Sequence, residues 1–467
     1  MLNYDGLIGR LDRQIATILP QQVIDQSHSD CGGFVSDGMA GPSNVSSVTS
    51  LGYAYLLEGS QYYQSQEILE RILMGAKFGR NARRVSGRFD LISTNFDSSP
   101  DTAFLVKALS PLVKAAQKKS VSGDSGAEEI AASLGEIIQT GAPGIVSGGF
   151  HTPNHRWVIV AALSQAQEIF PELELMETVE SYLAETIDIN NDGEYTERST
   201  AVYNAICNRS LRIASESLRR PELLEPVRKN LDLSYHLLHA DGSVVTSISS
   251  RQDRGKKVVP VDLADSYYAL ARMEQNGFYA AVADWLFDLS QGGVIWMLHP
   301  FLEHPEWRED DLKREQLVDS YSKVYPTSEI WRVRRGKMSA TAVSGITAPF
   351  SLKYGQIELN AVKVCASYFG TSQFIGEIFM EKEGNVHLTH PGRGWNRLTG
   401  SLQARDKPGS EEQWLESPGY FYPLGKPVGL GKWREMRSQR EFFSVPPMSM
   451  DLGIEEVVGG FNLRITT

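Results

Sequence analysis

The feature of this sequence that most constrains its fold is a helical spacing of apolar residues that runs to about residue 300. Apolar side chains recur three and four positions apart, as at Leu105, Leu109 and Leu112, which places them on one face of a helix. The connecting segments carry Gly, Pro, Asn and Asp, which are typical of turns. The predicted helices span 5–19, 46–58, 61–77, 101–118, 126–140, 153–169, 174–187, 198–217, 223–239, 263–275 and 278–290.

Pairs of these helices follow one another at intervals of about 40–50 residues, the range of helical-hairpin arrays. No repeated sequence accompanies the intervals, so we expect a closed toroid of hairpins rather than an open solenoid. From Ser328 onward, short alternating runs such as FSLKYGQIEL indicate antiparallel strands. The expected fold is α+β and multidomain: an (α/α) toroid of helical hairpins over residues 1–325, followed by a smaller antiparallel β-sandwich domain over residues 326–467.

The charge balance restricts the partners of the chain. Its 467 residues include 46 Lys and Arg against 57 Asp and Glu, for a net charge of -11. A general nucleic-acid binder is usually basic, so we expect no nucleic-acid partner. An anionic ligand would have to be held by a local cluster of Arg, Lys or amide groups. The three cysteines are far apart in the sequence and form no CxxC pair, which argues against a disulfide framework or a zinc ribbon.

The N-terminal segment predicts no export signal and no membrane anchor. Charged residues at Asp5, Arg10, Asp12 and Arg13 interrupt the apolar stretch that a signal peptide needs. No segment approaches 18 uninterrupted apolar residues, so we expect no transmembrane helix and no membrane partner. A cytoplasmic protein is favoured, and a mature exported form whose signal was replaced by Met1 is the alternative.

The segment SGGFHTPNHRWVIVAAL (147–163) contains the most informative candidate site. Thr152 is a good N-cap, and Pro153 suits the first position of a helix. Asn154 and His155 then fall in the first turn, where exposed N–H groups and partial positive charge favour a bound carboxylate. The same field would keep His155 neutral and available as a base. The alternative is that both side chains only cap the helix.

A second candidate segment, INNDGEYTERSTAVYNAICNRS (189–210), contains a turn followed by a helix. Glu197 and Tyr203 are its reactive side chains together with Tyr195. A tyrosine can donate or accept a proton when its neighbours shift its pKa, although a helical Tyr is more often a packed aromatic. The run from Asp188 begins like a calcium loop, but Ser199 stands where that loop needs Glu, so we expect a plain turn.

Two further polar segments supply cationic and amide groups. The segment HLLHADGSVVTSISSRQDRG (236–255) brings His239, Arg251 and Arg254, and Arg is suited to bidentate carboxylate contacts. The segment RFDLISTNFDSSPDTAF (88–104) brings Arg88 and Asn95 in a predicted loop that enters a helix. A solvated polar loop is the alternative for the first segment, and helix capping by Ser99 and Asp101 is the alternative for the second.

The Asn-His pair that opens a helix in NHRWV (154–158) and the segment DGEYTERSTAVYN (192–204) resemble the heparinase II/III-like polysaccharide lyases. The resemblance implies a helical toroid with a β domain. It assigns the roles of the family's catalytic Asn, His and Tyr to Asn154, His155 and Tyr203. The β region is short beside the large sandwich of the relatives. The further His that some relatives use is not identified; His236, His239 and His387 are the candidates.

The activity that the resemblance implies is β-elimination at a uronic acid, which leaves a 4,5-unsaturated uronyl end. Asn154 would neutralise the substrate carboxylate, with Arg251 or Arg88 beside it. His155 or Tyr203 would take the C5 proton, and Tyr203 would protonate the leaving oxygen. The expected partner is an acidic polysaccharide such as a glycosaminoglycan, alginate or gellan, with no cofactor or metal required. The other expected substrate-binding residues are Asn95, His151, Glu197, His239 and Arg254.

Two other functions remain open at this point. A glycoside hydrolase on a similar toroid would use two carboxylates that flank the scissile bond, and Asp101, Asp192 and Glu197 are available for this. A non-catalytic glycan-binding protein would stack Trp and Tyr side chains on sugar rings. The oligomeric state is left open.

Overall fold

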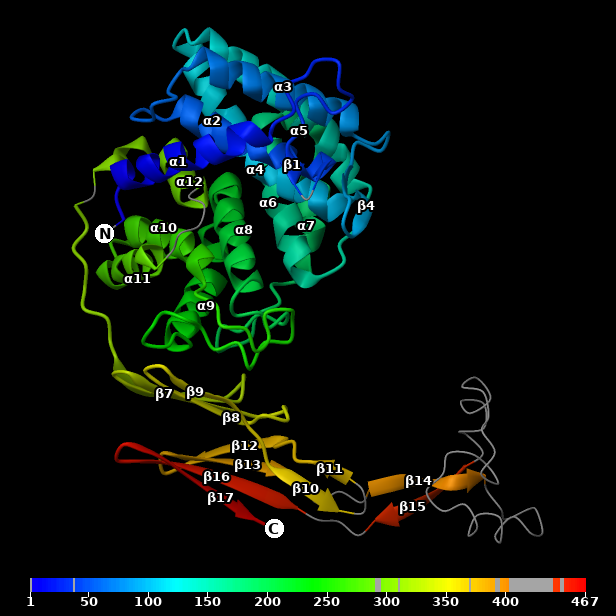
Figure 1. Ribbon diagram of the computed structural model, residues 1–467, viewed down its shortest axis with the longest axis vertical. Coiled ribbons are helices and arrows are strands. Elements are labelled where there is room, and N and C mark those ends of the chain that lie inside the picture. The colour runs from blue at the N-terminus through cyan, green and yellow to red at the C-terminus, as the bar shows by residue number, and fades with distance from the viewer. Residues whose placement is uncertain are drawn as a thin grey trace. The chain divides into compact units, whose positions relative to one another are not determined.

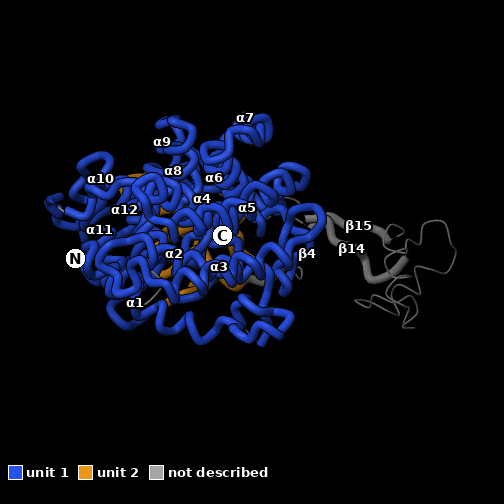
Figure 2. Tube along the Cα trace, turned by 90° about the horizontal axis from the view of Figure 1, so that it is seen from above, with its two compact units in different colours: residues 1–328, 332–340, 352–358 blue, residues 329–331, 341–351, 359–467 orange. Residues whose placement is uncertain are grey.

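The computed structural model describes residues 2–36, 38–289, 295–309, 311–368, 371–390, 395–402, 440–445 and 449–467. It divides the chain into two compact units (Figure 2). Unit 1 comprises residues 1–328, 332–340 and 352–358, and unit 2 comprises residues 329–331, 341–351 and 359–467. Every helix in the described ranges of the chain lies in unit 1. Residues 403–439 of the predicted β domain lie outside the described residues.

The helices of unit 1 form an inner ring and an outer set (Figure 1). Their bounds are α1 Tyr4–Ile18, α2 Val48–Leu56, α3 Gln66–Ala82, α4 Ser99–Val121, α5 Ser125–Val146, α6 Pro153–Ile169, α7 Met176–Ala184, α8 Tyr203–Leu218, α9 Leu224–His236, α10 Ala264–Glu274, α11 Gly277–Asp288 and α12 Ile295–Glu303. The even-numbered helices pack in a closed ring in which α12 returns to α2. Each odd-numbered helix packs on a neighbouring even-numbered one. The (α/α) toroid predicted from the helical spacing is therefore confirmed.

Burial explains which helices lie inside. Every residue of α2 is buried, and α6 is buried without interruption from Arg156 to Ala166. A helix that is buried on all sides carries mostly apolar or small residues around its circumference. An outer helix such as α1 instead buries one face, with Leu7, Leu11 and Ile15 on it. Each inner helix alternates in sequence with an outer helix that returns the chain. The inner helices therefore start at one end of the ring and finish at the other.

Short strands complete unit 1 and build unit 2. Two hairpins of unit 1 are β1 Val35–Ser36 with β2 Met39–Ala40, and β3 Phe89–Leu91 with β4 Asn95–Ser98. The later strands are β5 Ser320–Tyr325, β6 Ile330–Arg335, β7 Met338–Val343, β8 Phe350–Tyr354, β9 Ile357–Val362, β10 Cys365–Tyr368, β11 Thr371–Gln373, β12 Ile378–Lys382, β13 Asn385–His390, β14 Trp395–Leu402, β15 Arg440–Val445, β16 Met450–Val457 and β17 Gly460–Thr466.

The later strands form antiparallel sheets, as the alternating runs predict. One sheet has the order β5-β6-β7-β8-β9, a second has the order β12-β13-β16-β17, and β10-β11 and β14-β15 form ladders of two strands. In the second sheet, Val386 of β13 is opposite Ile454 of β16. Burial alternates along β13, so Val386, Leu388 and His390 face inward. This alternation is the period of two on which the prediction of strands was based.

Apart from shifts in helix bounds, the structure differs from the predicted elements in two places. Residues 88–104 were expected to be a loop that enters a helix, but β3 and β4 form a hairpin there, which places Asn95 in a strand. The short strands and the exposed Phe96 left no alternating apolar pattern to find. The second difference is α12, which was not predicted. It has nine residues with Pro300 inside it, too short and too interrupted to show a helical period.

Candidate active site

The start of α6 is the centre of the candidate site. Pro153 occupies the first turn, as predicted, and Thr152 is the N-cap residue with an extended backbone. The Thr152 side chain does not bond to the helix backbone; its hydroxyl oxygen accepts a hydrogen bond from Asn154 Nδ2 at 2.9 Å. The backbone N–H of Asn154 donates to the carboxylate of Glu197 at 3.0 Å. Thr152 is therefore the N-cap residue, as predicted, and the side-chain acceptor for the backbone at the start of α6 is Glu197, 43 positions away in the sequence.

Asn154 and Glu197 form a buried pair. Nδ2 of Asn154 donates to both carboxylate oxygens of Glu197, at 2.9 and 2.8 Å. The exposed fraction is 0% for Asn154 and 5% for Glu197. The N–H groups at a helix start attract negative charge. The carboxylate that α6 attracts here belongs to the protein itself.

Arg251 links this pair to Tyr203. Its Nε lies 3.4 Å from Oε1 of Glu197, and its guanidinium carbon lies 5.1 Å from the centre of the Tyr203 ring. A cation over an aromatic face is attracted by the quadrupole of the ring. Tyr203 is the first residue of α8, and its hydroxyl accepts a hydrogen bond from Gln252. Asn154, Glu197, Arg251 and Tyr203 therefore form one continuous set of contacts, which we call the N-terminal cluster.

His155 lies next to Asn154 with its ring half-buried. Burial is the main cause that lowers the pKa of His155 to about 4; Asp101 opposes the shift, and His151 and Arg251 add to it. The imidazole is therefore neutral at ordinary pH, as expected, although burial and not the field of the helix is the larger cause. Its ring packs edge-on against Phe104 at 6.1 Å and lies 5.8 Å from the ring of His151. Nδ1 of His155 has no hydrogen-bond partner among the described residues.

Asn95 reaches this site only through Asp101. Nδ2 of Asn95 donates to Oδ2 of Asp101 at 3.2 Å, and Asp101 lies in the first turn of α4. The charge of Asp101 acts on His155, so the three side chains belong to one neighbourhood. The inner helix α4 thus starts beside the starts of α6 and α8.

The predicted arginines differ in how they are placed. Arg88 is bound to Asp97, with Nη2 and Oδ2 2.9 Å apart. It lies against the glycine-rich approach to α6, because a Cβ on Gly148 would be 2.9 Å from Nη1 of Arg88. Arg254 is exposed, three positions after Arg251 on the same loop. Only Arg251 joins the N-terminal cluster.

His239 makes its contacts elsewhere. Its Nδ1 is hydrogen-bonded to Oγ of Ser339 at 2.7 Å and lies 3.2 Å from Nη2 of Arg332. Burial is the main cause that lowers the pKa of His239 to about 2, with Arg332 adding to the shift. These contacts give His239 a packing role beside β6 and β7.

Gln252 and Asp253 could not be selected from the sequence. Asp253 is 2% exposed, and its carboxylate accepts hydrogen bonds from Ser199 Oγ at 3.0 Å and from Ala201 N at 3.1 Å. These bonds fasten residues 246–255, which we call the site loop, to the chain just before α8. The only signal in the sequence is the density of Ser, Arg, Gln and Asp in SISSRQDRG, which also suits a solvated loop.

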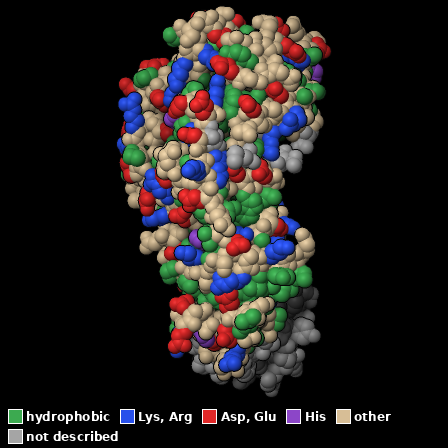
Figure 3. Space-filling view, turned by 90° about the vertical axis from the view of Figure 1, so that its left-hand side faces the viewer, with side chains coloured by type: hydrophobic (Ala, Val, Ile, Leu, Met, Phe, Trp, Pro, Cys, Tyr) green, Lys and Arg blue, Asp and Glu red, His purple; other side chains and the backbone are tan. Residues whose placement is uncertain are grey.

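The face of the molecule that Figure 3 views carries acidic and basic side chains interspersed, with no single sign of charge. Within the described ranges, no group of three or more His, Cys, Asp or Glu is arranged to hold a metal ion. A search of the same residues finds no helix with the length and apolar character needed to cross a bilayer.

No protein-family model and no curated protein matches this chain. Solved structures do match. A xanthan lyase from Paenibacillus is similar over 74% of this chain and 35% of its own, with a TM-score of 0.53 and 10% identity. An unsaturated glucuronyl hydrolase from Bacillus sp. GL1 covers 66% of this chain and 96% of its own, with a TM-score of 0.44 and 12% identity. A heparan sulfate lyase from Pedobacter heparinus covers 66% and 46%, with a TM-score of 0.41 and 13% identity.

These similarities concern the fold. The chain spans 35% of the length of the xanthan lyase, at an identity of 10%. At this identity a common architecture is shown, and function must be argued from the site. The toroid fold of polysaccharide lyases, which the resemblance in the sequence implied, is confirmed.

Proposed function

We propose that this protein is a polysaccharide lyase that cleaves a uronic-acid-containing glycan by β-elimination. The observation that carries the proposal is the N-terminal cluster beside a neutral His155. It combines a base, a cation and a phenol, the three kinds of group that this reaction needs. The similarity of the fold to a xanthan lyase supports the same conclusion.

The proposed reaction assigns one step to each of these groups. His155 takes the C5 proton of the uronate, and the electrons of the broken C–H bond form the C4–C5 double bond. The C4–O bond breaks, and the hydroxyl of Tyr203 protonates the leaving oxygen. The product carries a 4,5-unsaturated uronyl end. A pKa of about 4 leaves His155 in the form that accepts a proton at neutral pH.

Arg251 is the group that we assign to the substrate carboxylate. An amide nitrogen has two N–H donors. Nδ2 of Asn154 directs its donors to Thr152 and Glu197, so Asn154 acts as a positioning residue and not as the neutraliser that the resemblance implies. The side chain of Arg251 is 33% exposed and is held by Glu197 and Tyr203. A donor fixed in advance toward developing charge commonly contributes several kcal/mol to catalysis.

The proposed substrate class is an acidic polysaccharide of the glycosaminoglycan, alginate, gellan or xanthan kind. The mechanism requires a carboxylate next to the C5 proton, so neutral glucans should not be cleaved. The glycoside hydrolase alternative would need two free carboxylates, and that of Glu197 is already bound to Asn154 and Arg251. Asp192 is poorly suited, because its Oδ2 accepts hydrogen bonds from the backbone N–H groups of Thr327 and Ser328, both at 2.7 Å.

The first test is to incubate the full chain with a panel of these polysaccharides and to record two signals together. Absorbance of the conjugated unsaturated uronate measures elimination, and released reducing ends measure every cleavage. We expect both signals to rise together on at least one uronate polymer. Reducing ends without absorbance would contradict elimination and favour hydrolysis, and cleavage of a neutral glucan would contradict the assigned role of the carboxylate.

The second test uses Tyr203→Phe and His155→Ala on the polymer that is cleaved. Loss of a general acid or base should lower kcat by roughly 10²–10⁴-fold, while substrate binding is retained. Tyr354→Phe is the matched control, because Tyr354 is 58% exposed on β8 and loses the same hydroxyl. Full activity of Tyr203→Phe would remove Tyr203 from the proposed mechanism.

A further inference from the structure

A cavity of about 290 Å³ lies at the other end of the toroid from the N-terminal cluster. Its walls include Gln165 and Glu168 near the end of α6, Glu216 near the end of α8, and His299 and Glu303 near the end of α12. α4 adds Lys114 from its second half. None of these residues belongs to the candidate active site, so the cavity needs an account of its own.

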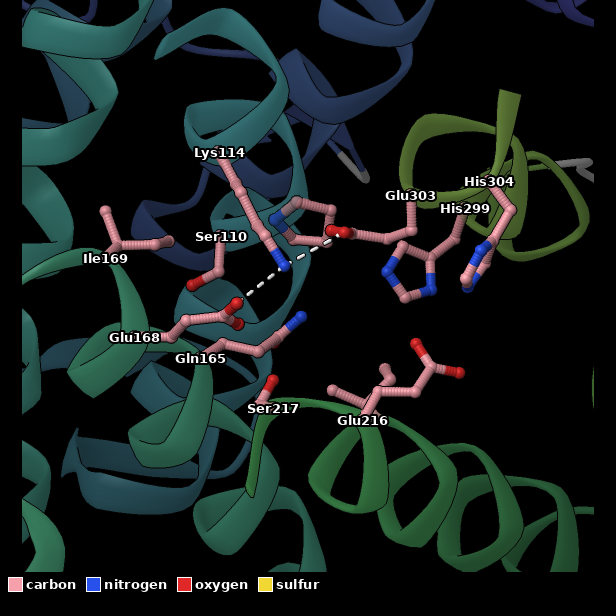
Figure 4. A pocket seen from close by; sticks show the side chains of 12 residues that line it. Ser110, Lys114, Gln165, Glu168, Ile169, Glu216, Ser217, His299, Glu303 and His304 are labelled. Carbon is pink, nitrogen blue, oxygen red and sulfur yellow. Dashed lines mark ion pairs between the residues drawn. The ribbon is translucent and has the colours of Figure 1, made fainter. Parts of the chain in front are cut away.

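Two polar side chains of the cavity wall are almost fully buried. Gln165 is 6% exposed and His299 is 1% exposed. Oε1 of Gln165 and Nδ1 of His299 have no hydrogen-bond partner among the described residues. A buried polar atom that is left unpaired costs about 1–3 kcal/mol, so such atoms commonly mark a place for a ligand or an ordered water. In Figure 4 these two side chains and Glu216 point toward the same space.

The unpartnered atoms accept hydrogen bonds. Oε1 of Gln165 is a carbonyl oxygen, which can only accept. Burial, with the charges of Arg212 and Arg209 adding to it, holds the pKa of His299 well below its ordinary value. A neutral imidazole has one nitrogen that accepts. Oγ of Ser110 already donates to the Val106 carbonyl at 2.8 Å, which leaves its oxygen to accept as well.

The carboxylates and helix ends at the cavity favour a cation, whereas the charges of Arg212, Arg209, Lys114 and His304 that act on His299 oppose one. α6, α8 and α12 all finish at the cavity, and the carbonyl groups at a helix C-terminus carry partial negative charge. None of the three helices has a basic residue in its last turn. The side chains that line the cavity include three carboxylates, those of Glu168, Glu216 and Glu303, and one lysine.

The structure already contains an ammonium group in this environment. Nζ of Lys114 bridges Glu168 at 2.8 Å and Glu303 at 2.9 Å (Figure 4). Burial opposes the charge of Lys114, but the bonds to these two carboxylates outweigh burial and raise its pKa. Glu216 is the third carboxylate. Its only ion pair among the described residues is with Arg212 of the same helix, at 3.3 Å.

We propose that this cavity binds a small organic ammonium ion, with Glu216, Gln165 and His299 accepting hydrogen bonds from its N–H groups. The volume suits a molecule of fewer than about ten heavy atoms, since one water occupies about 30 Å³ of liquid. The apolar walls formed by Pro111, Ile169 and Ile213 contact the carbon chain of the ligand. A short aliphatic amine or diamine fits this description.

The test is calorimetric titration of the full chain with 1,4-diaminobutane at neutral pH. We expect saturable binding of one diamine per chain. 1,4-Butanediol has the same carbon chain without charge, and it should not bind. A titration with potassium chloride at matched ionic strength separates binding in the cavity from general screening. Equal binding of the diol, an equal response to potassium chloride or no saturable binding of the diamine would overturn the proposal.

Three variants assign the binding to this cavity. Glu216→Gln removes the charge and should weaken diamine binding by at least about tenfold, as expected for a lost charge-assisted bond. Gln165→Met removes the unpartnered acceptor; it should weaken binding while the thermal midpoint of unfolding stays the same or rises. Glu222→Gln changes an exposed Glu outside the cavity and should bind like the original chain.

Glu216→Gln and Gln165→Met are measured as separate variants, so that one of them still tests the proposal if the other folds poorly. Unchanged diamine affinity in both variants would overturn the proposal. Neither variant touches the N-terminal cluster, so the outcome is independent of whether the chain is a lyase.

Discussion

At the scale of single residues, the candidate site depends on which groups pair with each charged side chain. The carboxylate of Glu197 accepts three hydrogen bonds from Asn154 and pairs with Arg251. Truncating Glu197 would remove the acceptor of the Asn154 backbone N–H and the ion-pair partner of Arg251, and it would leave Nδ2 of Asn154 bound to Thr152 alone. In the proposed mechanism, Glu197 acts by holding both donors in place.

The charge state of His155 gives a direct prediction. Because burial lowers the pKa of His155 to about 4, its C2 proton should titrate in NMR spectra with a midpoint about 4, compared with about 6.5 for an unperturbed histidine. A rate that depends on neutral His155 should then be lost as the pH falls through about 4. Assignment of the resonance uses its disappearance in His155→Ala. A midpoint near 6.5 would contradict the burial of this ring.

The position of some of these residues at a helix start could be predicted from the sequence, and the contacts of others could not. Asn154, His155 and Tyr203 could be selected because a helix start can be read from Pro153 and from the turn at Gly193. The partner of Asn154 could not be predicted, because Glu197 is 43 positions away and meets it only when α6 and α8 pack together. Tertiary contacts of this kind leave no local pattern.

At the scale of elements, the helices were predictable because their apolar period is set by packing against one core. The start of α8 was placed too early, since residues 198–202 are held by side-chain bonds rather than by helical ones. Ser199 and Thr200, for example, are bound to Asp253 and Ser249 of the site loop. The sequence carries no signal for which loop will supply such bonds.

A second prediction concerns the turn at Asn190 and Gly193, which precedes the site. Oδ1 of Asn190 accepts hydrogen bonds from the backbone N–H groups of Asp192 and Glu194, and Gly193 has a φ of 91°. A Cβ at Gly193 would lie 2.2 Å from the carbonyl oxygen of Lys229. Gly193→Ala should therefore lower the free energy of unfolding, as measured by urea denaturation.

Gly123→Ala is the matched control for this change. Gly123 has a φ of 96°, but a Cβ there would meet no atom within 4 Å. The control measures the backbone cost alone, which is about 1–2 kcal/mol for a non-glycine residue in the left-handed region. Gly193→Ala should cost more than that. Equal losses in the two variants would show that the contact with Lys229 is relieved at no cost.

At the scale of the whole molecule, the closed ring buries several histidines without charge. Burial is the main cause that lowers the pKa of His155 and His236 to about 4 and that of His239 to about 2, and it takes His299 well below its ordinary value. In the unfolded chain each of them should titrate near 6.5. At a pH between the pKa of the folded state and that of the unfolded state, the unfolded chain binds protons that the folded chain does not.

The sign of the resulting pH dependence follows from proton linkage. Where the unfolded state binds more protons, stability falls as the pH falls. The chain should therefore be more stable at pH 7 than at pH 5, with a lower urea midpoint at pH 5. His299→Gln should reduce this difference, because it removes one of the buried groups that must be protonated on unfolding. A urea midpoint that is the same at pH 5 and pH 7 would contradict the burial of neutral histidines.

The bonds of Asp253 have a consequence for how the molecule opens. The backbone N–H of Ala201 donates to Asp253 at 3.1 Å, that of Thr200 to Ser249 Oγ at 3.3 Å, and that of Ser250 to the Arg198 carbonyl at 2.9 Å. These amide protons lie outside regular helices and strands, where rapid exchange with solvent is usual. Deuterium exchange followed by mass spectrometry should instead find peptides covering 196–203 and 246–255 slow, and equally so. In Asp253→Asn both peptides should exchange faster together while α3 keeps its rate, because two distant stretches of chain would open as a single cooperative unit.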